Sequence, residues 1–363
     1  MSRYIAKWWA VAIPGLALPA LVLSWGRQLP TFVVIVLAVL LAGAVLAAVH
    51  HAEVIAHRVG EPFGSLVLAV AVTVIEVALI VSLMISGGEQ TASLARDTVF
   101  AAVMITCNGI VGLSLLTGTL RRRIAVFNAE GTGGALATVA TLSTLSLVLP
   151  TFTTSARGPA FSGPQLVFAA VVSLALYGLF VLTQTVRHRD YFLPVTTGGE
   201  PAGEEGHARR PTGRNALASL AMLLVGLVSV VGLAKVESPV IETAVTVAGL
   251  PQAVVGVVIA LLVLLPETLA AVRAAGRDHI QVSLNLALGS AMASIGLTIP
   301  AIAVASIWLE GPLLLGLGGT HVVLLGLTIA VSTLTVVPGR ATLLQSGVHL
   351  VLFAAYLFLA VSP

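Results

Sequence analysis

The sequence predicts an all-α polytopic membrane protein, and three observations support that prediction. Of the 363 residues, 58% are apolar and only 9% are charged, whereas a typical soluble domain has about 45–50% and about 25%. The uncharged runs are about 20 residues long, which is the length of a helix that spans a bilayer. These runs are continuous rather than alternating, so they indicate helices and not the strands of a barrel.

Eleven candidate spans result when the chain is divided at charges, at Pro/Gly clusters and at polar runs. They cover residues 5–25, 31–49, 63–86, 97–119, 132–150, 164–186, 214–235, 251–272, 280–308, 312–337 and 344–361. The first span follows a basic N-terminus but has no obvious small-residue cleavage site. We therefore interpret residues 1–30 as an uncleaved N-terminal transmembrane helix and not as a signal peptide.

The distribution of Lys and Arg tests this division, because basic residues are retained on the cytoplasmic side of a membrane. When successive connections are assigned to alternate sides, 14 of the 18 basic residues fall on one side. The other side receives Arg27, Arg96, Arg157 and Lys235. This asymmetry predicts a multi-pass protein of the bacterial cytoplasmic (inner) membrane, with a cytoplasmic N-terminus and an external C-terminus.

One long polar stretch, residues 187–213, has the composition of a flexible cytoplasmic linker. It separates a first group of five spans, residues 31–186, from a second group of five, residues 214–363. Because each group has an odd number of helices, two repeats would be inverted relative to each other, as in many secondary transporters. The segment Ser238–Leu250, which holds Glu242, is predicted to be an interfacial helical turn and not a span.

Two glutamates lie deep inside predicted spans. Glu76 stands near the middle of the third span, with no other charge between Glu61 and Glu89. Glu267 stands in the eighth span, after 24 uncharged residues that follow Glu242. A charged side chain at that depth costs on the order of 3 kcal/mol, so such residues usually line an interior cavity and carry function. Each glutamate lies on the second helix of its group, which favours a shared functional site over two protonated side chains that only bond to neighbouring helices.

Polar side chains accompany the two glutamates in the membrane. Asn285, Ser290 and Ser294 occur in the ninth span, and Asn108 occurs in the fourth. Carboxylate, amide and hydroxyl oxygens suit calcium, sodium or protons and do not suit zinc or copper. We therefore expect the two glutamates, as metal ligands, together with Asn108, Asn285 and Ser290, to bind the cation and protons. Simple helix packing remains an alternative role for the serines.

A third cluster precedes the third span and consists of His50, His51, Glu53 and His57. On a helix, His50, Glu53 and His57 would share one face. Histidines at this place indicate either a sensor of cytoplasmic pH or a solvated interfacial face.

Several other chemistries lack support in the sequence. It contains no H-E-x-x-H, no Gly-rich phosphate loop and no G-x-S-x-G in a strand-to-helix context, so ATP-driven transport and intramembrane hydrolysis are not indicated. The single cysteine, Cys107, excludes a disulfide within the chain. The formal net charge of +3 gives no indication of nucleic-acid binding. The expected partners are the lipid bilayer and the transported ions, with no cofactor and no prediction of an oligomeric state.

Four segments resemble the calcium/cation antiporter superfamily, and within it the bacterial ChaA-type calcium/proton (sodium/proton) antiporters. The segments are HHAEVIAHRVGEPFGSLVLAVAVTVIEVALI, LLPETLAAVRAA, SLNLALGSAMASIGLTIP and GVHLVLFAAYLFL. In that superfamily each half contains a repeat of two helices, with a glutamate on the first and a small, polar motif on the second. The resemblance implies that Glu76 and Glu267 are those glutamates and that Gly289 and Ser290 are the Gly-Ser motif of the second repeat. Asn108 matches the corresponding polar position of the first repeat more loosely.

The chain departs from its broader relatives at two kinds of position. Those relatives carry a Gly-Asn pair shortly before each glutamate, where this sequence has Val72-Thr73 and Val263-Leu264. They also carry a glutamine on the second helix of each repeat, where spacing gives Ala102 and Ala293. The two carboxylates are kept, and the ligands that would select the ion are changed.

These observations predict a secondary transporter that exports Ca²⁺, with Na⁺ and K⁺ as alternatives, in exchange for H⁺ by alternating access. Protons and the cation would compete for the oxygens of Glu76 and Glu267. Two other functions remain open at this point. One is an intramembrane enzyme that acts on lipids through His50, Glu53 and His57, and the other is a cation channel.

Overall fold

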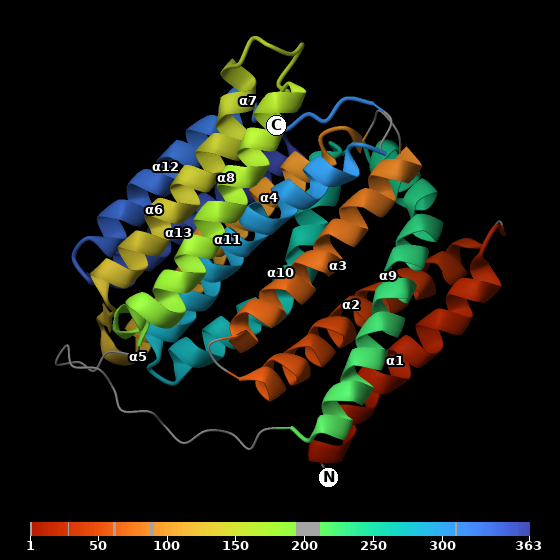
Figure 1. Ribbon diagram of the computed structural model, residues 1–363, viewed down its shortest axis with the longest axis horizontal. Coiled ribbons are helices and arrows are strands. Elements are labelled where there is room, and N and C mark those ends of the chain that lie inside the picture. Colours follow the sequence, from red (N-terminus) through yellow and green to blue (C-terminus); the bar gives the residue numbers. More distant parts are fainter. Residues whose placement is uncertain (1, 28, 61–62, 88–90, 194–210, 309–310) are drawn as a thin grey trace.

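The structure is a computed structural model that describes residues 2–27, 29–60, 63–87, 91–193, 211–308 and 311–363, and these residues form a bundle of long, tilted helices (Figure 1). Each predicted span corresponds to one helix or to a continuous series of helical segments. The helices are α1 (Ser2–Ser24), α2 (Thr31–Val59), α3 (Phe63–Gly87), α4 (Leu94–Met104), η2 (Ile105–Ile110), α5 (Val111–Arg122), α6 (Ala129–Ser143), η3 (Thr144–Val148), α7 (Leu149–Phe152), α8 (Gly163–Leu182), η4 (Thr183–Arg187), η5 (Arg189–Phe192), α9 (Gly213–Val247), α10 (Ala253–Gly276), α11 (Ile280–Ala305), α12 (Gly319–Val336) and α13 (Leu343–Val361). Within the described ranges, ten helical units are long and apolar enough to cross a membrane, and the apolar part of α1, Trp8–Ser24, is shorter.

The apolar side chains form two separate cores. The smaller core joins α1, α2 and α9 with Leu94 at the start of α4, and the larger core joins the remaining long helices. Helices α3 and α10 contribute one face to each core. Figure 1 shows α1, α2 and α9 on one side of the bundle, α6, α8, α12 and α13 on the other, and α3 and α10 between them. We call the boundary between the two cores the seam.

The helices α3 and α10 contribute to both cores. On α3, Leu79 packs into the smaller core while the next residue, Ile80, packs into the larger one. On α10, Val263 and Leu264 divide in the same way. Since neighbouring residues of a helix point in different directions, these two helices present opposite faces to the two cores. The glutamates predicted to carry function therefore lie on the two helices that follow the seam.

The fourth span is a continuous rod made of α4, η2 and α5, and its middle segment is a π-helix. The hydroxyl of Thr106 donates to the carbonyl oxygen of Ala102 at 2.7 Å. Such a bond to the backbone one turn earlier competes with the helical ladder and distorts it. Gly112 follows the π-helix, and a Cβ there would lie 2.9 Å from side-chain atoms of Leu350. The absence of a side chain lets α13 pack directly against the rod.

Three predicted boundaries are wrong. The second span continues as α2 to Val59, because the first helix-breaking residue is Gly60, with φ 77°. The segment Ser238–Leu250 is not a separate turn, since α9 runs on to Val247 in spite of Pro239. The span predicted from residue 312 begins only at Gly319. The extended backbone before it bonds to other elements instead, for example from the Leu317 N–H to the Leu147 carbonyl at 2.8 Å.

The N and C labels lie at opposite ends of the bundle in Figure 1, which is the arrangement that eleven spans would predict. Short strands β1 (Ala125–Val126) and β2 (Arg340–Ala341) pair antiparallel, with Ala125 opposite Ala341. The predicted linker, residues 187–213, lies largely outside the described residues, which resume at Pro211. The division into two five-helix groups remains a prediction.

The close approach of α10 to α4 predicts an effect on stability. A Cβ at Gly256 would lie 2.8 Å from the backbone nitrogen of Thr98 and 2.9 Å from the carbonyl carbon of Asp97. We expect Gly256→Ala to lower the free energy of unfolding by about 1–3 kcal/mol, because backbone atoms cannot move aside. Thermal unfolding of the purified protein in detergent measures the change.

The matched control is Gly178→Ala on α8, where an added Cβ would meet nothing within 4 Å. This change is expected to leave stability unaltered or to raise it by up to about 1 kcal/mol. Equal melting temperatures for the two variants would contradict the packing described for α4 and α10.

Candidate functional site

Glu76 is anchored across the seam. It lies on α3, is 4% exposed, and is therefore removed from the surface. The hydroxyl of Ser294 on α11 lies 2.7 Å from Oε1 and 2.8 Å from Oε2 of Glu76. Since a hydroxyl has a single proton, it is shared between the two carboxylate oxygens. This contact joins the second helix of the first group to the third helix of the second group.

Glu267 lies on α10 and is held less completely. Its Oε2 is buried and has no hydrogen-bond partner among the described residues. The negative charges of Glu76 and of Glu53 on α2 both act on Glu267. A buried carboxylate oxygen without a partner is energetically unfavourable, and a proton or a cation would compensate it. Glu267 is thus the part of this site that is chemically incomplete.

The surroundings of the two glutamates contain further oxygens and open space. Ser290 is half-buried and lies one helical turn before Ser294 on the same face of α11. A Cβ added to the neighbouring Gly289 would meet nothing within 4 Å. Pro266, which directly precedes Glu267 inside α10, has no N–H to donate to the previous turn. This part of the seam offers carboxylate, hydroxyl and backbone oxygens, the donor set of a hard cation.

The two asparagines predicted as ligands have other partners. The amide nitrogen of Asn108 donates to Thr328 at 2.9 Å, and its oxygen lies 3.2 Å from Nδ1 of His349. Asn285 donates to the carbonyl oxygen of Phe192 at 2.6 Å. It lies nine residues before Ser294, about 14 Å along α11. The structure therefore brings Glu76 and Ser294 together and engages both asparagines elsewhere.

A local distortion explains the direction of Asn108. The residue lies within η2, and a π-helical turn takes one residue more than an α-helical turn. Side chains in and after this segment are displaced around the axis relative to a regular helix. Asn108 consequently contacts α12 and α13.

The residues of the histidine cluster lie on two different faces of α2. His51 is buried, with Nε2 2.9 Å from the Ala10 carbonyl oxygen and Nδ1 3.3 Å from the Ser219 hydroxyl. His50 and Glu53 lie on another, half-exposed face, 3.8 Å apart, and His57 is exposed. The helical spacing predicted for this cluster is confirmed, and its role in pH sensing stays a prediction.

Two buried acidic residues escaped the sequence analysis. Glu237 is 2% exposed, and its Oε1 has no hydrogen-bond partner in the described parts of the chain. The predicted seventh span stopped at residue 235, so Glu237 was placed outside the membrane. Asp97 is also buried, but Arg96 lies 2.7 Å away and compensates its charge. A predicted seventh span that continued past residue 237 would have placed Glu237 inside the membrane.

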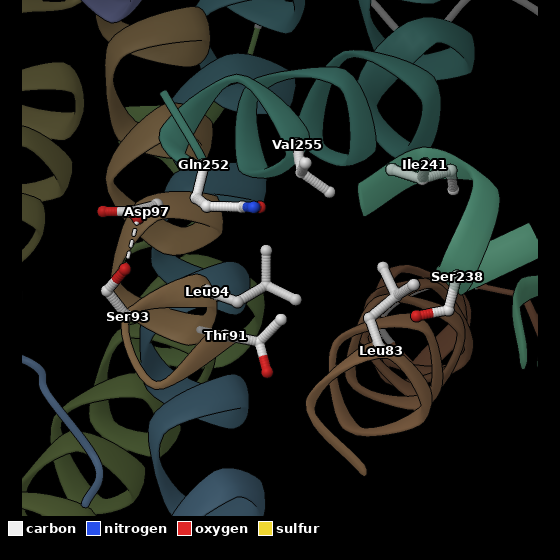
Figure 2. A pocket seen from close by; sticks show the side chains of 9 residues that line it. All are labelled: Leu83, Thr91, Ser93, Leu94, Asp97, Ser238, Ile241, Gln252 and Val255. Carbon is white, nitrogen blue, oxygen red and sulfur yellow. Dashed lines mark hydrogen bonds between the residues drawn. The ribbon is translucent and has the colours of Figure 1, made fainter. Parts of the chain in front are cut away.

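A small pocket lies at the end of the seam opposite the N-terminus. Figure 2 shows it between Leu83 of α3, Ser93 and Asp97 at the start of the rod, Ser238 of α9 and Gln252 beside α10. The hydroxyl of Ser93 donates to Asp97 at 2.8 Å. Leu83 is seven residues after Glu76, about 10 Å along α3. The pocket therefore lies about two helical turns beyond Glu76 along α3.

No group of three or more His, Cys, Asp or Glu side chains that could hold a metal ion occurs among the described residues.

Comparison with known proteins gives a consistent result. The family model described as sodium/calcium exchanger protein matches residues 11–186 and 218–362, which is most of the chain. The chain is 47% identical over 366 residues to the putative ionic transporter y4hA of Sinorhizobium fredii, and the match covers 100% of this chain and 98% of that protein. It is 33% identical over 352 residues to the sodium-potassium/proton antiporter ChaA of Escherichia coli, covering 96% of this chain and 94% of that one.

Solved structures show the same fold. Native YfkE is 14% identical, with a TM-score of 0.71, and the match covers 98% of this chain and 100% of that one. The H⁺/Ca²⁺ exchanger CAX is 16% identical, with a TM-score of 0.70, covering 97% of this chain and 88% of that one.

The missing hydrogen-bond partner of Glu267 Oε2 predicts that a substitution at this position raises the stability of the protein. We expect Glu267→Gln to raise the thermal stability of the protein in ion-free detergent at alkaline pH by about 1 kcal/mol or more. The change replaces a carboxylate whose buried Oε2 has no hydrogen-bond partner among the described residues with an uncharged amide, which costs less to bury. Glu130→Gln, an exposed position at the start of α6, is the control and is expected to have no effect. Destabilisation by Glu267→Gln in these conditions would show that the carboxylate is already compensated.

Proposed function

Because the chain belongs to the sodium/calcium exchanger protein family, we propose that it is a cation/proton antiporter in which Glu76 and Glu267 bind the cation and the protons in turn. The observation that carries this proposal is the buried, partnerless Oε2 of Glu267, on the seam that also holds the Ser294-bound Glu76. A bound proton or cation stabilises a buried carboxylate oxygen that lacks a hydrogen-bond partner more than it stabilises one that already has a partner.

Competition between protons and the cation follows from the charge of the two carboxylates. A calcium ion neutralises both and displaces two protons, whereas a sodium or potassium ion neutralises one. With both carboxylates charged and no ion bound, a rearrangement of the two cores would move uncompensated charge through a low-dielectric region. This cost couples the movement of the bundle to occupancy, so that ions and protons cross only in exchange.

The identity of the cation depends on the other oxygens. Thr73 is buried three residues before Glu76, and Ala102 and Ala293 are buried where broader relatives carry an amide. Fewer amide oxygens leave the carboxylates and hydroxyls as the main ligands, a donor set that accepts Ca²⁺, Na⁺ or K⁺. The name of the 33% identical relative, a sodium-potassium/proton antiporter, supports transport of the alkali ions. The family description, sodium/calcium exchanger protein, supports calcium.

Alternating access would use the seam. The smaller core contains the first two helices of each five-helix group, and the larger core contains the last three of each, with α3 and α10 shared. This composition supports the prediction of two inverted repeats. Rocking of one core against the other would open the carboxylates first to one side and then to the other. We propose that the pocket beside Leu83 and Gln252 (Figure 2) is the external vestibule, with the N-terminus in the cytoplasm.

The chain is an ion transporter and not an enzyme, since its relatives are exchangers and antiporters. The lipid-acting enzyme considered for His50, Glu53 and His57 is therefore set aside. A channel would pass cations without moving protons, which the following experiment distinguishes.

Inverted membrane vesicles that hold an imposed pH gradient test the proposal directly. Addition of Ca²⁺, Na⁺ or K⁺ is expected to dissipate the gradient when the wild-type protein is present. Glu76→Gln and Glu267→Gln are each expected to slow this exchange about 100-fold, because an amide has no negative charge for the cation and cannot take up and release the proton. Fluorescence of a pH-sensitive dye reports the gradient.

Glu130→Gln is the control and should exchange like the wild type. If none of the three cations dissipates the gradient, or if both seam variants remain active, the antiporter proposal is wrong. Cation flux that leaves the pH gradient untouched would identify a channel.

A separate prediction concerns the hydroxyl that holds Glu76. Ser294→Ala is expected to raise the cation concentration for half-maximal exchange about 10-fold, since a hydrogen bond to a charged group contributes about 1.5–3 kcal/mol. Ser143→Ala is the matched control, because that buried hydroxyl donates only to the Val139 carbonyl of its own helix, at 2.7 Å. An unchanged half-maximal concentration in Ser294→Ala would show that this serine does not position Glu76 for the ion.

A further inference from the structure

Two buried threonines beside the seam have hydroxyls without a partner. Thr98 on α4 and Thr298 on α11 are both 0% exposed. Neither Oγ1 has a hydrogen-bond partner among the described residues. A buried hydroxyl of this kind is unfavourable, because it has lost its bonds to water and gained none in the protein. The hydroxyls of both threonines are therefore available to a ligand.

Other helical threonines of this bundle satisfy their hydroxyls within their own helix. Ten of them donate to the carbonyl oxygen four residues earlier, at 2.7–2.9 Å, namely Thr106, Thr117, Thr119, Thr138, Thr141, Thr183, Thr185, Thr243, Thr268 and Thr333. The same bond is open to Thr98 and Thr298, since each has a full helical turn before it. Neither makes it, so their hydroxyls are directed away from their own backbone.

Thr298 faces the seam from α11. It lies one turn beyond Ser294 on the same face, and Ser294 bonds both carboxylate oxygens of Glu76 on α3. Gly296, between the two, is turned toward α8, because a Cβ there would lie 2.7 Å from Cβ of Tyr177. Residues two apart in a helix point in nearly opposite directions. Thr298 therefore faces away from α8 and toward α3.

Thr98 faces the seam from the rod. Leu94, one turn earlier on the same face, packs into the smaller core and lines the pocket of Figure 2. Phe100, two residues after Thr98, points the other way, with its ring 4.9 Å from that of His321 on α12. Val99 packs into the larger core. Thr98 is thus directed away from α12, at the boundary between the two cores.

The later residues of α11 lie toward the pocket. Figure 1 shows α3 and α11 running to the same end of the bundle. The segment after α11 bonds the residue before the rod, from the Leu314 N–H to the Ala92 carbonyl oxygen at 3.1 Å. Thr298 is four residues after Ser294, about 6 Å along the helix. Thr298 consequently lies one turn to the pocket side of the serine that holds Glu76.

Thr98 lies at a similar level on the rod. Leu94 and Leu83 both line the pocket. Thr98 is about 6 Å inward from Leu94 along α4, and Glu76 is about 10 Å inward from Leu83 along α3. The two threonines therefore lie between the pocket and Glu76, about one helical turn from the carboxylate.

The charge at this level fits an alkali cation. Glu76 supplies one negative charge about a turn away, and hydroxyl oxygens are neutral ligands of hard cations. Asp97, which precedes Thr98, is already paired with Arg96 at 2.7 Å. One carboxylate neutralises Na⁺ or K⁺, whereas Ca²⁺ would keep a net charge in a buried place, which is costly.

We propose that Thr98 and Thr298 form an outer site for alkali cations, in which two hydroxyls hold Na⁺ or K⁺ and Glu76 attracts it. The ion binds there on its way between the pocket of Figure 2 and the two carboxylates. The part of the outer site in transport rests on the proposed antiport function. The binding of the ion does not, and it is measured separately.

The first test measures ion binding by the full-length protein in detergent. The melting temperature is followed as NaCl replaces choline chloride at constant ionic strength, and in a second series as CaCl₂ is added, since a bound ion stabilises the folded state. Thr98→Val/Thr298→Val keeps the side-chain shapes and removes both hydroxyls. The Na⁺ concentration for half of the stabilisation is expected to rise about 10-fold or more. The Ca²⁺ concentration is expected to change less than about twofold, because Ca²⁺ is neutralised by Glu76 and Glu267 together.

Thr119→Val is the matched control on the same rod, since that buried hydroxyl donates to the Leu115 carbonyl oxygen at 2.7 Å. It should keep the wild-type Na⁺ value, as should Thr98→Ser, which retains a hydroxyl. The single variants Thr98→Val and Thr298→Val are each expected to raise the value about threefold or more, so the result does not depend on the folding of the double variant.

Two outcomes of this test overturn the inference. Wild-type Na⁺ values in the valine variants would show that the hydroxyls hold only water. Equal increases for Na⁺ and Ca²⁺ would show that both ions use one common site.

The second test determines the side from which the ion reaches the outer site. In right-side-out vesicles, where Na⁺ is added at the external face, Thr98→Val/Thr298→Val is expected to raise the Na⁺ concentration for half-maximal exchange about 10-fold. In inverted vesicles the change should stay below about twofold, because Na⁺ then arrives at the carboxylates from the cytoplasmic side. An equal change in both orientations overturns the placement of the site between the pocket and Glu76. If the wild type exchanges no ion in either orientation, the antiport proposal is wrong, and the melting measurements still decide whether the threonines bind Na⁺.

Discussion

The arrangement of this bundle depends on the cost of a carboxylate oxygen that has no partner in a low-dielectric interior. Oε2 of Glu267 is such an oxygen within the described residues, and two other carboxylates act on the same side chain. A protein can retain this arrangement only if something else compensates the charge for part of the time. In the proposed antiporter, the incomplete bonding of Glu267 is the feature on which ion and proton exchange would rest.

The carboxylates lie at the boundary between the two cores, so the cost of their charge acts on that boundary. Leu79 and Ile80 on α3, like Val263 and Leu264 on α10, pack into different cores. The carboxylates consequently lie where one packed unit meets another, and packed cores move as units because they are not continuously deformable. The state of charge on the seam acts on the boundary that would have to move. The charge of a carboxylate pair inside either core would not act on the boundary between the cores.

The sequence predicted the fold well and the site in part. Uncharged runs and helix-breaking residues gave one helix for each span, since spans are determined by burial in lipid. The end of α9 was missed because Glu237 and Pro239 resemble the residues that end a helix, while the surrounding helices bury Glu237. Glu76 and Glu267 were found from their depth alone. Ser294 could not be preferred over Ser290, since one turn of helix separates them and only the position of α3 selects the first.

The asymmetry of the site follows from one difference in sequence between α11 and the rod. Ser294 lies on the third helix of the second group and bonds Glu76 of the first group. The corresponding helix of the first group is the rod, and the spacing that matches Ala102 with Ala293 places Val103 at the position of Ser294. Val103 has no hydroxyl that could donate to Glu267. Asn108, on the π-helix Ile105–Ile110, bonds Thr328 and His349 instead. One carboxylate is therefore bonded while Oε2 of the other has no partner among the described residues, because a serine stands on one helix and a valine on the other.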